Sequence, residues 1–171
     1  MTLALGFDPG NSAGLALIDV SASRPVLVRA WGIWGKPSTR WPRFDQAFAE
    51  AGALAGPGTM LGIEIPAGGG ATSRRTHGWQ LSIGRHIGHA EVTARRLGWE
   101  VRHIKTNTWT RPAGIRHKKL GEGLHRIDEA SRLVDGVELV ELGRSKAARE
   151  RQVCLAEAIL IALWASKLTT T

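Results

Sequence analysis

Three acidic residues of this 171-residue chain lie in strongly apolar segments, where carboxylates are rare. Asp8 follows a short apolar run and precedes a Pro-Gly turn, and Glu64 lies in the run Met60–Ile65. Glu157 lies in the run Val153–Trp164, with no Lys or Arg three or four residues away. Burying an unpaired carboxylate is costly, so each acid is expected to be exposed, hydrogen-bonded or bound to a cation. Converging carboxylates hold hard ions such as Mg²⁺ or Mn²⁺, and a pair of such ions supports phosphodiester cleavage.

Each acid also has an ordinary interpretation when taken alone. Asp8 could simply start the turn that follows it, and a strand-end acid such as Glu64 is usually a salt-bridged edge residue. By strand alternation Gly62 shares a face with Glu64, and its missing side chain would let a metal or phosphate approach. The metal interpretation therefore depends on whether the three acids meet.

The positive charge of the chain is unevenly distributed. The net charge is +8, and the segment from Ile65 to Gly121 contains eleven Lys and Arg against Glu91 and Glu100. A localised basic region is typical of proteins that bind a polyanion such as nucleic acid, although a solvated surface is the alternative. A membrane surface is disfavoured, because the basic residues do not follow one face of a strongly amphipathic helix.

Length and composition indicate a globular chain, with residues 1–171 forming a single domain. No apolar run reaches the length that a transmembrane helix needs, and the first residues do not resemble a secretory signal. The single cysteine, Cys154, fits a reducing compartment. We therefore expect a cytoplasmic protein, in a bacterium or a phage-infected host.

Hydrophobic periodicity predicts an alternation of strands and helices. Loops are expected at 35–42, 66–71 and 111–123, where Gly and Pro accumulate. The predicted strands are 2–9, 14–20, 25–33, 59–65 and 99–104, and the predicted helices are 43–54, 78–97, 124–134 and 145–167. This order, with an acid on the first hairpin, predicts an α/β fold of the ribonuclease-H-like kind: a five-stranded mixed sheet with helices on both faces. The first and fourth strands would be neighbours, and the last helix would cross their ends.

Several segments together resemble RuvC-type Holliday junction resolvases, particularly compact phage members of that family. Each segment is a weak signal alone, and the combination is more specific. The first hairpin matches at Leu5–Ala16 and the second acid at Ile63-Glu64. A glycine-spaced helix matches at Gly84–Ala90, and a basic segment that contains glycine matches at Ala113–Lys119. The acidic C-terminal helix matches at Ala156–Ala162.

The resemblance implies an endonuclease that makes paired symmetric nicks in four-way DNA junctions. Asp8, Glu64 and Glu157 would be its catalytic residues and would bind Mg²⁺ or Mn²⁺, with two ions per active site. The family usually carries an Asp or His three residues before the last acid. This chain has Cys154 there, which is a poor ligand for Mg²⁺ and is interpreted as a small core residue.

The resemblance also implies a homodimer and a DNA-binding surface. Gly84 and Gly88 would allow two helices to approach across a dimer interface, although internal packing is the usual role of such a pair. Lys118 could also stabilise charge on the phosphate in the transition state, while any single lysine is more often plain solvated surface. The expected DNA-binding residues are Arg74, Arg75, His77, Arg111, Arg116, His117, Lys118 and Lys119.

Two other functions remain open, and a third is disfavoured by the length of the chain. A less selective ribonuclease-H-like nuclease would cut branched DNA or hybrids, and a junction-binding protein without catalysis would explain the missing acid at Cys154. Actin-like ATPases also begin with an Asp-x-Gly hairpin. They need two such domains, for which this chain is too short.

Overall fold

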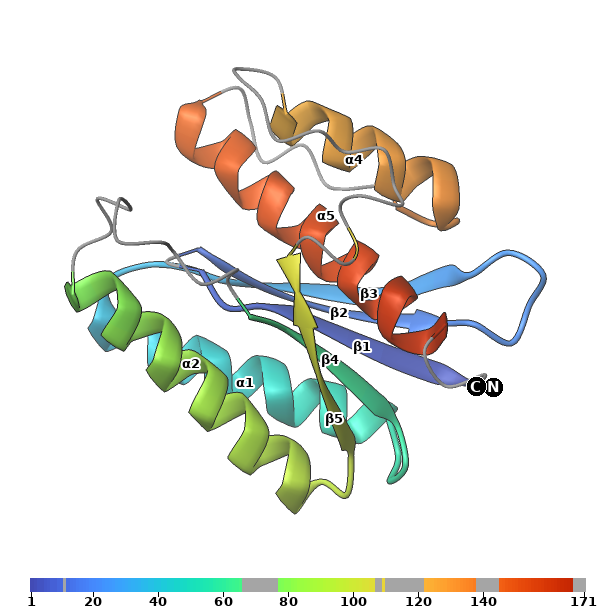
Figure 1. Ribbon diagram of the computed structural model, residues 1–171, viewed down its shortest axis with the longest axis horizontal. Coiled ribbons are helices and arrows are strands. Elements are labelled where there is room, and N and C mark those ends of the chain that lie inside the picture. Colours follow the sequence, from blue (N-terminus) through green and yellow to red (C-terminus); the bar gives the residue numbers. More distant parts are fainter. Residues whose placement is uncertain (11, 66–76, 107–108, 110–121, 138–144, 168–171) are drawn as a thin grey trace.

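A computed structural model describes residues 1–10, 12–65, 77–106, 109, 122–137 and 145–167 of the chain (Figure 1). The strands and helices alternate much as the periodicity predicts. In chain order they are β1 (Leu3–Asp8), β2 (Ala13–Asp19), β3 (Val26–Ile33), α1 (Pro37–Leu54), β4 (Met60–Ile65), α2 (His77–Arg96), β5 (Glu100–Lys105), α4 (Glu122–Leu133) and α5 (Lys146–Lys167).

The five strands form one mixed sheet in the order β3-β2-β1-β4-β5, which confirms the predicted fold class. β2 is antiparallel to β1 and β3, whereas β4 is parallel to β1 and β5. In the parallel pair, Phe7 is aligned with Ile63. Asp8 and Glu64 are one residue further along, at the end of β1 and next to the end of β4, so they lie at the same edge of the sheet.

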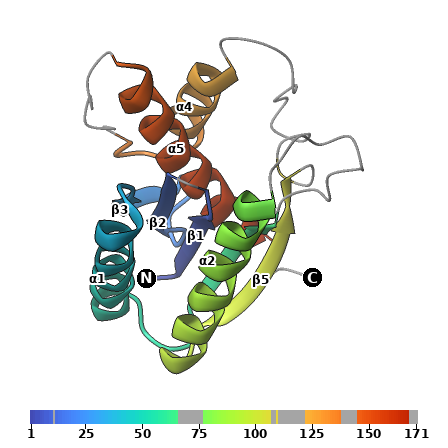
Figure 2. The same ribbon diagram turned by 90° about the vertical axis from the view of Figure 1, so that its left-hand side faces the viewer.

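Helices cover both faces of the sheet. α1 and α2 lie against one face, while α5, with α4 packed on it, lies against the other (Figures 1 and 2). β1 is buried on both faces: Leu5 and Phe7 belong to the core with α1, and Ala4 belongs to the core with α5. Because side chains alternate along a strand, Asp8 points to the α5 face.

α5 rests directly on the backbone of the central strands. A Cβ atom added to Gly6 of β1 would lie 2.1 Å from the carbonyl oxygen of Ala158, and one added to Gly14 of β2 would lie 2.4 Å from that of Cys154. The expectation that Gly62 leaves room for a metal or phosphate is wrong. A Cβ there would lie 2.8 Å from the Cβ of Ala165, so α5 fills the space.

The predicted loop at 35–42 is also wrong from Pro37 onward, because α1 begins there and continues through Pro42. Pro37 suits a first helical turn, where its missing N–H would have no partner in any case. Pro42 removes only one backbone hydrogen bond. The aromatic ring of Trp41 packs against that of Phe44, with 5.8 Å between their centroids, so the first turns are anchored to the core.

Most other boundaries agree with the sequence expectations to within two residues. α4 begins at Glu122, so the predicted loop 111–123 ends two residues earlier than expected. The remainder of that loop and all of the predicted loop 66–71 lie outside the described residues. Gly98 and Gly136, which follow the ends of α2 and α4, have φ angles of 72° and 74°. Among the described residues, no helix has the length and apolar character needed to cross a bilayer.

A buried histidine of α2 is expected to make the stability of the fold depend on pH. His86 is 2% exposed and packs against the ring of Trp41, with 5.0 Å between centroids. Burial, helped by the charge of Arg40, lowers its pKa to about 4. The folded state therefore resists protonation of His86, and stability is lost as pH falls below the unfolded pKa of about 6.5.

We expect the free energy of unfolding to fall by about 2 kcal/mol between pH 7 and pH 5 through this group. Urea unfolding of wild type and His86→Leu at the two pH values measures the contribution. The variant should lose less stability than the wild type over this interval. An identical loss in both proteins would contradict the assignment.

Candidate active site

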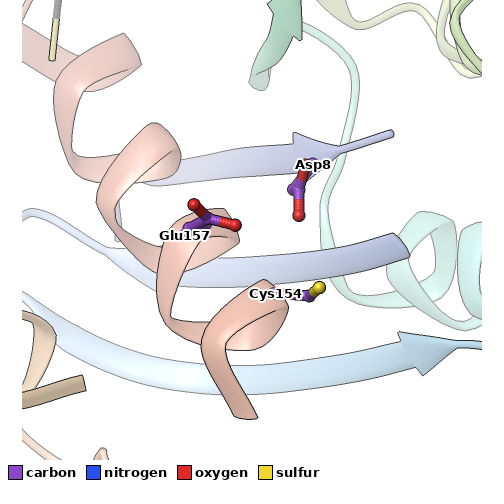
Figure 3. Close-up of side chains that lie close together, drawn as sticks. All are labelled: Asp8, Cys154 and Glu157. Atoms are coloured by element: carbon purple, nitrogen blue, oxygen red, sulfur yellow. The ribbon is translucent and has the colours of Figure 1, made fainter. Parts of the chain in front are cut away.

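The three acids of the apolar segments come together at one edge of the sheet. Asp8 ends β1, and it shares a hydrogen bond with Glu64 near the end of the adjacent strand β4. Cys154 and Glu157 are three residues apart on α5 and therefore project to the same side of the helix. Ligand atoms of Asp8, Cys154 and Glu157 lie within 4.8 Å of one another (Figure 3).

Asp8 is the most strongly perturbed of these acids. Its side chain is buried, and burial together with the nearby Glu64 carboxylate raises its pKa well above the usual value. The Cys154 thiol donates a hydrogen bond to Asp8, and the charge of Arg126 also favours the ionised form, but both effects are smaller. A cation bound here would remove the cost of keeping Asp8 ionised.

Glu64 is held in place by donors that follow β5. The indole Nε1 of Trp109 donates to its carboxylate over 3.2 Å, and Thr106 also forms a side-chain hydrogen bond with it. Burial raises the pKa of Glu64, and these hydrogen bonds offset part of that effect. Trp109 is itself buried, so its ring is fixed in the core while its indole N–H orients this acid.

Glu157 has a cationic partner that the sequence analysis missed. Arg126 of α4 forms an ion pair with it, and the two side chains are only 15% and 12% exposed. The guanidinium carbon of Arg126 also lies 5.9 Å from the centre of the Trp109 ring. The sequence spacing could have indicated this pair. Arg126 is four residues before Ala130 and therefore shares a helix face with it, and Ala130 lies where α4 packs against α5.

Cys154 is more than the small core residue that the sequence suggested. It is half-buried, and its S–H donates a hydrogen bond to the Asp8 carboxylate. Burial and the neighbouring Asp8 raise the pKa of this thiol, so it stays protonated. A neutral thiol is a poor ligand for a hard cation. The donors that fit Mg²⁺ or Mn²⁺ are therefore the oxygens of the three acids.

The structure places the other predicted site residues only in part. His77 is the first residue of α2. Gly84 and Gly88 lie on the exposed side of α2, where an added Cβ would meet no described atom within 4 Å, so they do not serve packing within the described part of the chain. The predicted DNA-binding residues outside the described ranges are Arg74, Arg75, Arg111, Arg116, His117, Lys118 and Lys119.

Comparison with solved structures identifies proteins of the same architecture. The structure of Thermus thermophilus RuvC matches with a TM-score of 0.64 and 17% identity, covering 99% of this chain and 98% of that one. T. thermophilus RuvC in complex with a Holliday junction substrate matches with a TM-score of 0.61 and 19% identity, covering 95% and 92%.

A eukaryotic protein gives a similar match. The yeast mitochondrial Holliday junction resolvase Ydc2 has a TM-score of 0.57 and 13% identity, covering 96% of this chain and 79% of that one. No protein-family model and no curated protein sequence matches the chain. The likeness therefore lies in the fold, which is that of RuvC-type resolvases, as the sequence resemblance implied.

Proposed function

We propose that this protein is a metal-dependent endonuclease that resolves four-way DNA junctions by paired symmetric nicks. The observation that carries the proposal is the convergence of Asp8, Glu64 and Glu157 at one sheet edge. It is supported by the fold, which is shared with resolvases that include one solved on a Holliday junction substrate.

The three acids would form the site at which Mg²⁺ or Mn²⁺ binds, and its ligands would be oxygen atoms only. A bound divalent ion would supply activation of a water molecule and neutralisation of charge on the scissile phosphate. Asp8 and Glu64 lie in hydrogen-bond contact, so they would share one ion. Trp109 and Thr106 orient Glu64, and burial of Asp8 keeps competing water away from the ligands. Lys118 is proposed to contact the phosphate.

Branched DNA is the proposed partner because of charge. The region from Ile65 to Gly121 has nine more basic than acidic residues, and it adjoins the acids in sequence at Glu64. Lys and Arg bind the phosphate backbone and position the duplex without reading its sequence. The cluster of acids would then meet a phosphate that the surrounding basic residues hold in place.

Cleavage of a synthetic junction tests the proposal. A four-way junction of fixed sequence is labelled on each strand in turn and incubated with the protein in Mg²⁺ or Mn²⁺. Symmetric nicks on two opposite strands are expected. Scattered nicks, or equal rates on forks, duplexes and RNA–DNA hybrids, would instead indicate a less selective nuclease. Binding to the junction at low salt without cleavage would indicate a binding protein.

A homodimer is proposed because a four-way junction is nearly two-fold symmetric and needs two symmetric cuts. The exposed side of α2 offers a suitable surface. Leu81 and Val92 are 58% and 49% exposed there, and Gly84 and Gly88 lie between them. Two such helices could pack closely, because the glycines bring no side chains to the contact.

Gly88→Arg is expected to convert the dimer to a monomer without lowering the melting temperature. No described atom of the same chain lies near the new side chain, and glycine within a helix is itself unfavourable. Light scattering after size-exclusion chromatography measures the mass, and calorimetry measures the melting temperature. A variant that remains dimeric would show that the interface lies elsewhere.

A further inference from the structure

We propose that Arg126 is a fixed positive charge of the active site, which takes the place of one of the two expected divalent ions. The site would then bind a single Mg²⁺ or Mn²⁺ through Asp8 and Glu64, while Glu157 holds Arg126. This inference rests on the proposed nuclease function, and it revises the expectation of two ions per site.

The contacts of Arg126 place it within the acid cluster. Its guanidinium is paired with Glu157, and both side chains are largely buried. Its charge also lowers the pKa values of Asp8, Glu64 and Cys154, so it lies near every member of the cluster. An arginine remains charged at any pH of interest, so the positive charge is permanent.

The charge balance favours one divalent ion. Once a metal binds, the three acids are ionised and carry three negative charges, of which Arg126 offsets one. One divalent ion neutralises the rest, whereas two would leave the site strongly positive before DNA binds. A second ion beside Glu157 would also have a thiol and a guanidinium as neighbours, and neither is a ligand for a hard cation.

The fold holds Arg126 in this position. α4 packs on α5 through Ile127 and Ala130, which lie one and four residues after Arg126 in the helix. The guanidinium lies over the ring of Trp109, and Trp109 in turn binds Glu64. The Nε atom of Arg126 is buried and has no hydrogen-bond partner in the described part of the chain.

Counting bound Mn²⁺ in the absence of DNA tests the inference. Free Mn²⁺ is measured by electron paramagnetic resonance during titration of the full-length protein. We expect one ion per chain for the wild type, with Asp8→Asn weakening binding by at least about tenfold. Glu157→Gln is expected to weaken binding less than Asp8→Asn, because it removes a charge near the ion but none of its ligands.

Substitution of Arg126 provides a second test of the inference. Arg126→Gln frees Glu157 and removes a repulsive charge, so it is expected to bind Mn²⁺ at least about tenfold more tightly or to bind a second ion. Arg132→Gln is the matched control. It removes the same charge from the same helix, but Arg132 pairs with Glu129 and contacts none of the three acids. Its Mn²⁺ binding is expected to equal that of the wild type.

Two ions per wild-type chain would overturn the inference. So would a loss of affinity in Glu157→Gln equal to that in Asp8→Asn, or unchanged or weaker binding in Arg126→Gln. If Arg126→Gln does not fold, the double variant Arg126→Gln/Glu157→Gln removes both charges together and should still bind one ion. Junction cleavage by the wild type is scored separately, so a one-ion protein that cuts no junction contradicts the proposed function alone.

Discussion

Asp8→Asn is expected to lower the rate of junction cleavage by at least about a thousandfold in Mg²⁺ and in Mn²⁺, while junction binding persists. Asp8 lies between Glu64 on the neighbouring strand and the α5 residues Cys154 and Glu157. Asparagine has the same shape and keeps one oxygen but carries no negative charge, so it binds a divalent ion much more weakly than aspartate. Labelled junctions under single-turnover conditions measure the rate, and a gel-shift assay in Ca²⁺ or EDTA measures binding.

The same substitution is expected to stabilise the protein when no metal is bound. The folded-state pKa of Asp8 is raised by burial and by Glu64. Such a group contributes stability at low pH that is lost as pH rises through its folded pKa. At pH 7 in EDTA, Asp8→Asn should therefore melt at a higher temperature than the wild type, with a smaller difference at pH 4.

Asp19→Asn is the matched control for this experiment. Asp19 also ends a strand of the sheet, β2, but its carboxylate accepts hydrogen bonds from Ser21 at the opposite edge. Cleavage by this variant should equal that of the wild type. Retention of cleavage by Asp8→Asn would exclude Asp8 as a metal ligand, and a parallel loss in Asp19→Asn would indicate that the assay reports folding.

The convergence of Asp8 and Glu64 could be predicted because it follows from local patterns. Both acids come at the end of short apolar strands, and strands in this order place the first and fourth side by side. The strand register then brings the two carboxylates together. Glu157 was identified by the same reasoning, as a charge in an apolar helix.

The partners of these acids could not be predicted in this way. Arg126 and Trp109 reach the site from segments far from Glu157 and Glu64 in the sequence, through tertiary packing of α4 on α5 and of the end of β5 on β4. The beginning of α1 was missed for a related reason. Pro42 reads locally as a helix breaker, but the packing of Trp41 and Phe44 outweighs the loss of one hydrogen bond.

The contact between α5 and the sheet gives the largest expected effect on stability. An added Cβ at Gly6 would lie 2.1 Å from the Ala158 carbonyl oxygen and 2.3 Å from the Ala162 nitrogen. Both atoms belong to helix backbone, so no side-chain rotation can relieve the clash, and α5 must move away from β1. We expect Gly6→Ala to lower the free energy of unfolding by about 3 kcal/mol, measured by urea denaturation.

Displacement of α5 should also impair the site, because this helix carries Cys154 and Glu157 while Asp8 stays on β1. Gly6→Ala protein that remains folded at low temperature is therefore expected to cut junctions more slowly than the wild type.

Gly56→Ala is the control, since a Cβ there meets no described atom within 4 Å and its backbone has no positive φ. Its stability and cleavage rate should match the wild type. Equal stability of Gly6→Ala and Gly56→Ala would mean that α5 does not rest on the β1 backbone as described.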